Sequence, residues 1–144
     1  MYEYKAELDR VVDGDTVDVD IDLGFGIWLK KERVRVMGID TPESRTSDPV
    51  EKVFGKAASA RLKELIEHDC ILVTTKDRSG EDERGKFGRV LGDFKLSDGR
   101  FVTEVLISEG HAVDYYGGSK AELLEQHMKN RERLVSEGKV TLPT

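Results

Sequence analysis

A strand-like alternation beginning at Asp15 constrains the fold of this chain more than any other feature. Aliphatic side chains occupy every second position, and polar or acidic side chains occupy the positions between them. This period of two is typical of a half-buried β-strand. The apolar face holds Val17, Val19, Ile21 and Leu23, and the polar face holds Thr16, Asp18, Asp20 and Asp22. Asp15 shares the parity of the apolar face, so its carboxylate is predicted to point toward the core side where the strand begins.

The segment after this strand predicts a hairpin. Residues 24–28, Gly-Phe-Gly-Ile-Trp, are typical of a hairpin tip or a bulged extension. A second strand is predicted from Leu29 to Ile39, where arginines alternate with valines around Arg35. Gly38 breaks that alternation just before Asp40, as a bend or a close backbone approach would. The hairpin therefore brings acids and an arginine toward one another.

The rest of the chain predicts three helices and several further strands. The first helix has two candidate starts, a capping box at 48–51 and the glycine at 55, and its apolar stripe continues to residues 65–66. Strands are expected at 2–9, 70–76, 86–96 and 111–113, a charged turn at 77–85, and helices at 101–109 and from Ser119, where a second capping box lies. The stripe of the last helix is predicted to comprise Leu124, His127/Met128, Arg131 and Leu134/Val135.

These elements predict the α+β class. A five-stranded, OB-like β-barrel with three α-helices is the natural closure, because it leaves few free strand edges. The length of 144 residues fits one domain, spanning 1–144 with its core at about 5–135, and needs no disulfide to support a core. Cys70 is the only cysteine and lies in an apolar run, which predicts a buried structural thiol.

Composition excludes several classes of protein. A hydrophobic content of 38% is too high for disorder, and no apolar run approaches a membrane span. The three histidines are dispersed, so a zinc site is not indicated. A net charge of −6 argues against a tight, processive nucleic-acid binder, but not against an enzyme that visits a phosphodiester briefly. The N-terminus lacks the features of a secretory signal, which predicts a cytoplasmic protein unless a leader was removed.

Three carboxylates at predicted strand ends form a candidate metal site. Asp15, Asp40 and Glu43 offer hard oxygen ligands, and two carboxylates about 4 Å apart repel by roughly 4 kcal/mol at an effective dielectric near 20. A divalent cation would offset that repulsion, and all-oxygen ligation suits calcium, with magnesium or manganese as alternatives. The other interpretation is that these acids only form turns.

Basic and aromatic residues form a candidate phosphate site. Arg35 and Arg89 offer guanidinium groups of the kind that stabilise phosphoryl transfer, and a solvated surface arginine is the alternative for each. Lys86, Tyr115 and Tyr116 are predicted to touch phosphate or to stack on a base. A role in turn packing is equally open for the two tyrosines.

Taken in order, four motifs resemble the thermonuclease (staphylococcal nuclease-like) family over nearly the whole chain, from about residue 5 to 135. They are Asp13-Gly14-Asp15-Thr16, Arg35 five residues before Asp40-Thr41-Pro42-Glu43, Phe54-Gly55 followed by Ala57-Ala58, and Lys86-Phe87-Gly88-Arg89. The resemblance implies an OB-fold and a calcium-dependent nuclease that cleaves DNA and RNA, preferably single-stranded, at the 5′ P–O bond to leave 3′-phosphate ends.

The resemblance also implies a role for each matching residue. Asp15 and Asp40 bind calcium through their carboxylates, and Thr41 through its backbone carbonyl. Glu43 orients or deprotonates the attacking water. Arg35 and Arg89 grip the scissile phosphate, and Tyr116 matches the family's pocket tyrosine better than Tyr115 does.

The chain departs from the family in several places. Phe87 stands where the family often has tyrosine, so one phosphate contact is lost, and the 24–31 hairpin is long, with Trp28 expected to cover the site or dock a partner. The C-terminal tryptophan motif is missing, which predicts a loose tail. Two alternatives stay open: a catalytically silent nucleic-acid or protein binding module, and a dimer through the 24–29 hairpin in place of the expected monomer.

Overall fold

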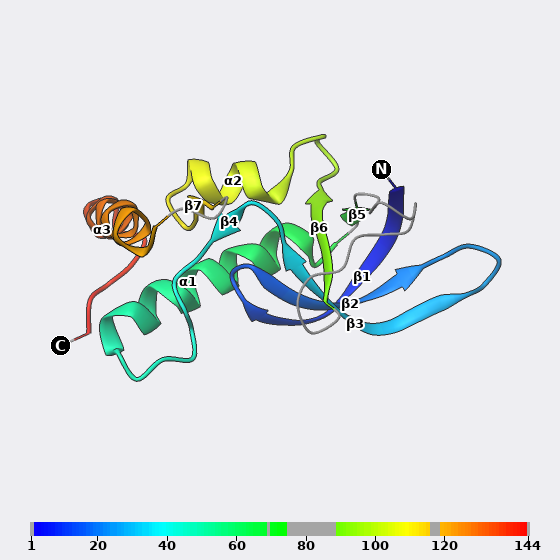
Figure 1. Ribbon diagram of the computed structural model, residues 1–144, viewed down its shortest axis with the longest axis horizontal. Helices are drawn as coiled ribbons and strands as arrows, with labels where there is room; N and C mark the ends of the chain where they lie inside the picture. The colour runs from blue at the N-terminus through cyan, green and yellow to red at the C-terminus, as the bar shows by residue number, and fades with distance from the viewer. Residues whose placement is uncertain (1, 69, 75–88, 116–118, 144) are drawn as a thin grey trace.

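The computed structural model describes residues 2–68, 70–74, 89–115 and 119–143 (Figure 1). Its elements are, in chain order, β1 (Tyr2–Asp13), β2 (Thr16–Asp22), β3 (Trp28–Val36), β4 (Ile39–Asp40), α1 (Pro49–Ile66), β5 (Cys70–Thr74), β6 (Val90–Lys95), α2 (Val102–Ser108), β7 (Val113–Asp114) and α3 (Lys120–Ser136). Figure 1 shows α3 at one end of the molecule and the tip of the β2–β3 hairpin at the other. The predicted turn at 77–85 and the start of the predicted 86–96 strand lie outside the described residues.

Five strands close a barrel in the order β1-β2-β3-β6-β5. All neighbours are antiparallel except β3 and β6, which are parallel and place Arg35 level with Leu91. The barrel core is aliphatic and also holds Cys70, which is 1% exposed and donates its thiol to the Ala6 carbonyl. The predicted α+β, five-stranded barrel with three helices is therefore confirmed, and so is the structural role of the thiol.

The alternation from Thr16 to Leu23 sorts its side chains as predicted except at both ends, since Thr16 of the predicted polar face is buried, at 8% exposed. Val17, Val19 and Ile21 are at most 3% exposed, whereas Leu23 is 40% exposed because it has passed beyond the barrel. The tip that follows is fully exposed at Phe25. The register pairs the far end of β2 with Trp28, so the hairpin tip points away from the end of β2 that follows Asp15. The expectation that Trp28 covers the site is therefore wrong.

Gly38 divides the predicted 29–39 strand in two. Its φ of +78° is a left-handed conformation that favours glycine, and the chain turns there. The single predicted strand is therefore β3 followed by β4, and β4 leaves the barrel to pair with β7, with Asp40 opposite Val113. This bend puts Asp40 outside the barrel wall, between the barrel and the C-terminal helix.

Helix α1 begins at the capping box and not at the glycine. The Asp48 carboxylate accepts hydrogen bonds from the backbone of the first turn, and Pro49 occupies the first helical position. Gly55 serves a different purpose, because a Cβ at that position would collide with the backbone carbonyl of Glu43. The small residue lets α1 lie directly against the loop that follows β4.

Helix α3 begins at the predicted cap, where the Ser119 hydroxyl accepts a hydrogen bond from the backbone N–H of Glu122. Its predicted apolar stripe is partly wrong, since Leu124 and Met128 are exposed and Leu134 is the buried member. The tail that follows is docked, not loose. Val140 is 8% exposed and packs in a cluster with Phe54 and Leu134.

Candidate functional site

The candidate site lies where the β1–β2 turn meets the loop that follows β4. Asp13 joins these two segments, because its Oδ1 accepts hydrogen bonds from the backbone N–H of Ser44 at 3.1 Å and from the Ser44 hydroxyl. Gly14 allows the turn to approach α1, since a Cβ there would lie 2.7 Å from the Cβ of Ala58. The first three sequence motifs therefore have a common structural function: they hold two loops and a helix in contact.

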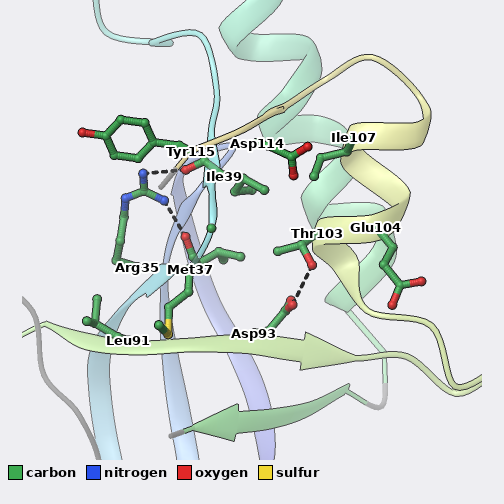
Figure 2. A pocket seen from close by; sticks show the side chains of 12 residues that line it. Arg35, Met37, Ile39, Leu91, Asp93, Thr103, Glu104, Ile107, Asp114 and Tyr115 are labelled. Atoms are coloured by element: carbon green, nitrogen blue, oxygen red, sulfur yellow. Dashed lines mark hydrogen bonds between the residues drawn. The ribbon is translucent and has the colours of Figure 1, made fainter. Parts of the chain in front are cut away.

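Arg35 is fixed at the end of β3 by three neighbours. Its Nη1 donates to the Val36 carbonyl at 2.5 Å and its Nη2 to the Ile39 carbonyl at 2.8 Å, as Figure 2 shows. Nη2 also lies 3.4 Å from Oδ2 of Asp15, and both side chains are less than one-fifth exposed. The guanidinium is thus held in one orientation, which is a requirement for electrostatic stabilisation of a charged group.

Asp15 is a largely buried carboxylate, with 14% of its side chain exposed, as its parity predicts. Burial raises the pKa of Asp15 above its usual 3.8, and the nearby charge of Asp40 adds to the increase. The charge of Arg35 and the hydrogen bond from the Thr16 hydroxyl, at 2.9 Å, act in the opposite direction. Since burial is the largest effect, the ionised carboxylate is destabilised, and a further positive charge near it would be favourable.

Asp40 has a partner that the sequence analysis did not assign to the site. Its Oδ2 lies 2.8 Å from Nε2 of His127, which comes from α3, 87 residues later in the chain. The His127 side chain is only 12% exposed. Helical periodicity predicts His127 in the apolar stripe of the helix, and its polarity within that stripe is the only sequence signal of another role.

The hydrogen bonding of Thr41 bears on whether a cation fits at this site. Its hydroxyl oxygen is buried without a hydrogen-bond partner among the described residues. Within residues 2–68, 70–74, 89–115 and 119–143, no group of three or more histidine, cysteine, aspartate or glutamate side chains is arranged to hold a metal ion. The candidate donors are therefore the carboxylates of Asp15 and Asp40 and the oxygens of Thr41. This small, hard-oxygen set fits calcium, which completes its coordination with water.

Glu43 lies near these donors but does not share their burial. It is exposed, and its backbone N–H is at a long hydrogen-bond distance of 3.5 Å from Oε1 of Glu51. The three predicted carboxylates therefore do not form one buried cluster. Asp15 and Asp40 are close enough to influence each other, and Glu43 stands on the open side of the loop.

Arg89 borders a different depression from Arg35. It lines a cavity of about 650 Å³ together with Asp13, Thr16 and Arg33. Arg89 immediately precedes β6, and Leu91 is level with Arg35, so the two arginines have the same parity on adjacent strands. The structure thus brings them to one face of the sheet but not into one cavity.

Arg35 lines a larger cavity of about 700 Å³ between the barrel and α2 (Figure 2). Tyr115 lies beside Arg35 in this view, and its backbone N–H donates to the Gly38 carbonyl at 3.0 Å. On the far side the Thr103 hydroxyl donates to Oδ2 of Asp93 at 2.6 Å, and burial raises the pKa of Asp93. Lys86 and Tyr116, the other predicted substrate residues, lie outside the described residues.

No helix in the described part of the chain is both long and apolar enough to cross a membrane.

Comparison with known proteins finds relatives along most of the chain. The sequence profile of the family described as "Staphylococcal nuclease homologue" matches residues 33–142. The chain is 36% identical over 127 residues to the thermonuclease of Staphylococcus intermedius, covering 86% of this chain and 69% of that protein. It is 33% identical over 131 residues to endonuclease YncB of Bacillus subtilis (strain 168), covering 90% of this chain and 57% of that protein.

A further relative is the SPbeta prophage-derived endonuclease YokF of Bacillus subtilis (strain 168). The identity is 33% over 131 residues, which cover 90% of this chain and 41% of that protein. The chain thus spans about half the length of the two Bacillus relatives.

Proposed function

The chain belongs to the staphylococcal nuclease homologue family, and on that premise we propose that it is a nuclease that hydrolyses phosphodiester bonds of nucleic acids. The observation that carries this proposal is the fixed guanidinium of Arg35, ion-paired with the buried carboxylate of Asp15 at 3.4 Å. An arginine held by backbone carbonyls beside carboxylates is suited to receive a phosphate and a cation together.

Arg35 has donors left for a phosphate. Two of the five N–H groups of an arginine donate to the carbonyls of Val36 and Ile39, and Nη2 also lies 3.4 Å from Asp15, so at least two N–H groups remain. We propose that these donate to the phosphate oxygens, on which negative charge grows during displacement. Because the guanidinium is already oriented, little reorganisation accompanies the reaction. Arg89 is proposed to hold a second oxygen of the same phosphate, which requires its side chain to turn from its own cavity toward Arg35.

Calcium is proposed as the cofactor. Asp15 and Asp40 would hold it through their carboxylates, and Thr41 through its backbone carbonyl. When bound, the cation supplies positive charge that polarises the phosphate and favours ionisation of water. The raised pKa of the buried Asp15 carboxylate supports this role, because a cation would stabilise its ionised form.

Glu43 is proposed to act on the attacking water. Its exposed position on the loop leaves its carboxylate open to solvent, where it can accept a proton from the water as the water oxygen bonds to phosphorus. The 5′-oxygen of the following nucleotide then leaves, taking a proton from solvent, and the phosphate stays on the 3′-oxygen. The products are a 3′-phosphate end and a 5′-hydroxyl end.

The substrate is proposed to be DNA and RNA, preferably single-stranded. The cavity beside Arg35 is lined by Tyr115 and apolar side chains, which suit an unpaired base, and also by Asp93, Glu104 and Asp114, whose negative charge disfavours a long phosphate backbone. A net charge of −6 does not favour wrapping a long duplex, so brief contact at a local site fits the charge better. The alternative function is a silent module that binds nucleic acid or protein without cleaving it.

A digestion assay with end-group analysis tests the proposal. The protein is incubated with single-stranded DNA and RNA oligonucleotides, with calcium or with excess EGTA. A phosphatase that removes 3′-phosphates is then applied before extension by a template-independent polymerase. We expect cleavage only with calcium, and extension of the DNA products only after phosphatase treatment.

The possible results separate the parts of the proposal. Undiminished cleavage in EGTA would contradict the calcium assignment. Products that extend without phosphatase would contradict the bond assignment. Binding of the oligonucleotide with calcium, but no hydrolysis of DNA or RNA, would favour the silent module over the nuclease.

A further inference from the structure

A polar contact between His127 of α3 and Asp40 of β4 lies at the candidate site. The proposed reaction assigns no role to this contact. Nε2 of His127 lies 2.8 Å from Oδ2 of Asp40, and the imidazole is 12% exposed while the carboxylate is 36% exposed. The interaction is therefore sheltered on the histidine side and open on the carboxylate side. An imidazole with hydrogen on Nε2 donates to Asp40 in this geometry.

We propose that His127 is a positioning residue that orients the Asp40 carboxylate toward a divalent cation, an inference that rests on the proposed function. A carboxylate has two oxygens and about four lone-pair sites. One hydrogen bond to Oδ2 fixes rotation about the Cβ–Cγ bond and leaves Oδ1 for ligation. Hydrogen bonds from outside the ligand set orient metal-binding carboxylates in this way and affect metal affinity.

The local backbone explains why Asp40 needs such a partner. β4 has only two residues and lies outside the barrel, so strand pairing with β7 is its main backbone support. Asp15, by comparison, is held by the Thr16 hydroxyl and by Arg35. Without His127 the half-exposed Asp40 side chain would rotate freely, and ordering it would reduce the affinity for the cation.

A purely structural tie between α3 and the body of the protein is the competing explanation. The structure contains such a tie nearby, because Nδ2 of Asn130 donates to the Ala112 carbonyl at 3.3 Å. Asn130 lies on α3 one turn after His127 and makes this contact with the segment before β7. Removing the Asn130 bond weakens the docking of α3 without touching Asp40, so it provides a matched control.

The experiment compares His127→Leu, His127→Gln and Asn130→Ala with the wild type. Calcium chloride is titrated into each metal-free protein in a calorimeter, and thermal unfolding without calcium reports on folding. We expect His127→Leu to bind calcium about 10-fold or more weakly, in the range known for loss of such hydrogen bonds. His127→Gln, whose amide can reach the position of Nε2, should recover most of the affinity, and Asn130→Ala should bind calcium like the wild type.

Nuclease assays at varied calcium provide the second readout. For His127→Leu we expect the calcium concentration at half-maximal rate to rise by the same factor, with kcat restored at saturating calcium. If His127→Leu does not fold, histidine-selective ¹⁵N NMR of the wild type decides: calcium saturation should shift the His127 ring signals, and unchanged signals would overturn the inference.

The outcomes distinguish this inference from the proposed function. If the wild type binds calcium and cleaves its substrate, but His127→Leu binds calcium with equal or higher affinity, only the inference about His127 is overturned. An equal loss in Asn130→Ala, or no recovery in His127→Gln, would also overturn it in favour of a structural tie. A wild type that binds no calcium would overturn both this inference and the calcium assignment.

Discussion

Arg35 and Asp15 form an ion pair in which only the Arg35 side chain is also held by backbone carbonyl groups. The Arg35 guanidinium donates to the carbonyls of Val36 and Ile39, whereas Asp15 relies on Arg35 and the neighbouring Thr16 hydroxyl. Arg35 therefore keeps its orientation if Asp15 turns toward another charge. The two backbone carbonyls thus hold the arginine even when the Asp15 carboxylate binds another charge.

Replacing Arg35 tests the phosphate site. Arg35→Ala is expected to lower kcat by at least about 10²-fold, as loss of an oriented electrostatic donor does, and Arg89→Ala is expected to do the same. Arg100→Ala is the matched control, because Arg100 pairs with Asp98 and lines neither the cavity of Arg35 nor that of Arg89. Steady-state rates on a single-stranded oligonucleotide are the measurement. Wild-type rates for both Arg35→Ala and Arg89→Ala would remove the proposed mechanism.

Replacing Asp15 tests the cation site through stability. Burial raises the pKa of Asp15, so Asp15→Asn removes a charge that is unfavourable in the metal-free fold, and the melting temperature without calcium should increase. The wild type should gain about 2.7 kcal/mol at a calcium concentration of one hundred times Kd, and the variant should gain almost none. Thermal unfolding with and without calcium measures both effects. A variant that calcium stabilises as much as it does the wild type would show that Asp15 is not a ligand.

Gly55→Ala reverses the usual effect of removing a glycine from a helix. Alanine is favoured over glycine by about 1 kcal/mol in a helix interior. Here the added Cβ would strike the Glu43 carbonyl, so we expect a net loss of about 1–3 kcal/mol in the free energy of unfolding. Lys56→Ala, at the next and exposed position, should change stability by less than about 0.5 kcal/mol. Urea unfolding at pH 7 provides the measurement, and a more stable Gly55→Ala protein would contradict the packing described.

The burial of His111 predicts how the free energy of unfolding depends on pH. Burial lowers its pKa below the ordinary 6.5, and its Nδ1 has no hydrogen-bond partner among the described residues. The folded protein therefore keeps the imidazole neutral, while the unfolded chain takes up a proton from about pH 6.5 downward. The stability that this residue contributes is intact above pH 6.5 and is lost as the pH falls toward the folded pKa.

His111→Leu should remove this acid sensitivity. The free energy of unfolding of the variant, relative to the wild type, is expected to be higher at pH 5 than at pH 8. His68→Leu is the control, because the His68 side chain is 86% exposed. Urea unfolding at the two pH values measures the difference, and parallel behaviour of wild type and His111→Leu between them would disprove the role of burial.

Local patterns in the sequence predicted most of the elements, and tertiary contacts decided the rest. The period of two in β2 and the cap at Asp48 needed no distant partner, so both were predicted. The choice between Asp48 and Gly55 as the start of α1 could not be made, because the reason for Gly55 is the Glu43 carbonyl on another segment. The docked Val140 was missed for the same reason, since its partner Phe54 lies far away in the sequence.

The site was predicted residue by residue, but its geometry was not. Motif order identified Asp15, Arg35 and Asp40 as candidates, and the structure brings these three into one neighbourhood. The link from Asp40 to His127 spans 87 residues and belongs to no local pattern. The separate cavity of Arg89 follows from parallel pairing of two non-consecutive strands, which hydrophobic periodicity does not reveal.

The parallel pairing of β3 with β6 also has a consequence for the time course of folding. It joins Val34 to Val90, so the barrel closes only after a long loop has been ordered, and contacts of such sequence separation form slowly. The same pairing sets Arg35 level with Leu91, next to Arg89. Closure of the barrel and alignment of the two arginines are therefore one event. A chain that has formed only its early hairpin carries Asp15 and Arg35, but Arg89 does not yet lie beside β3.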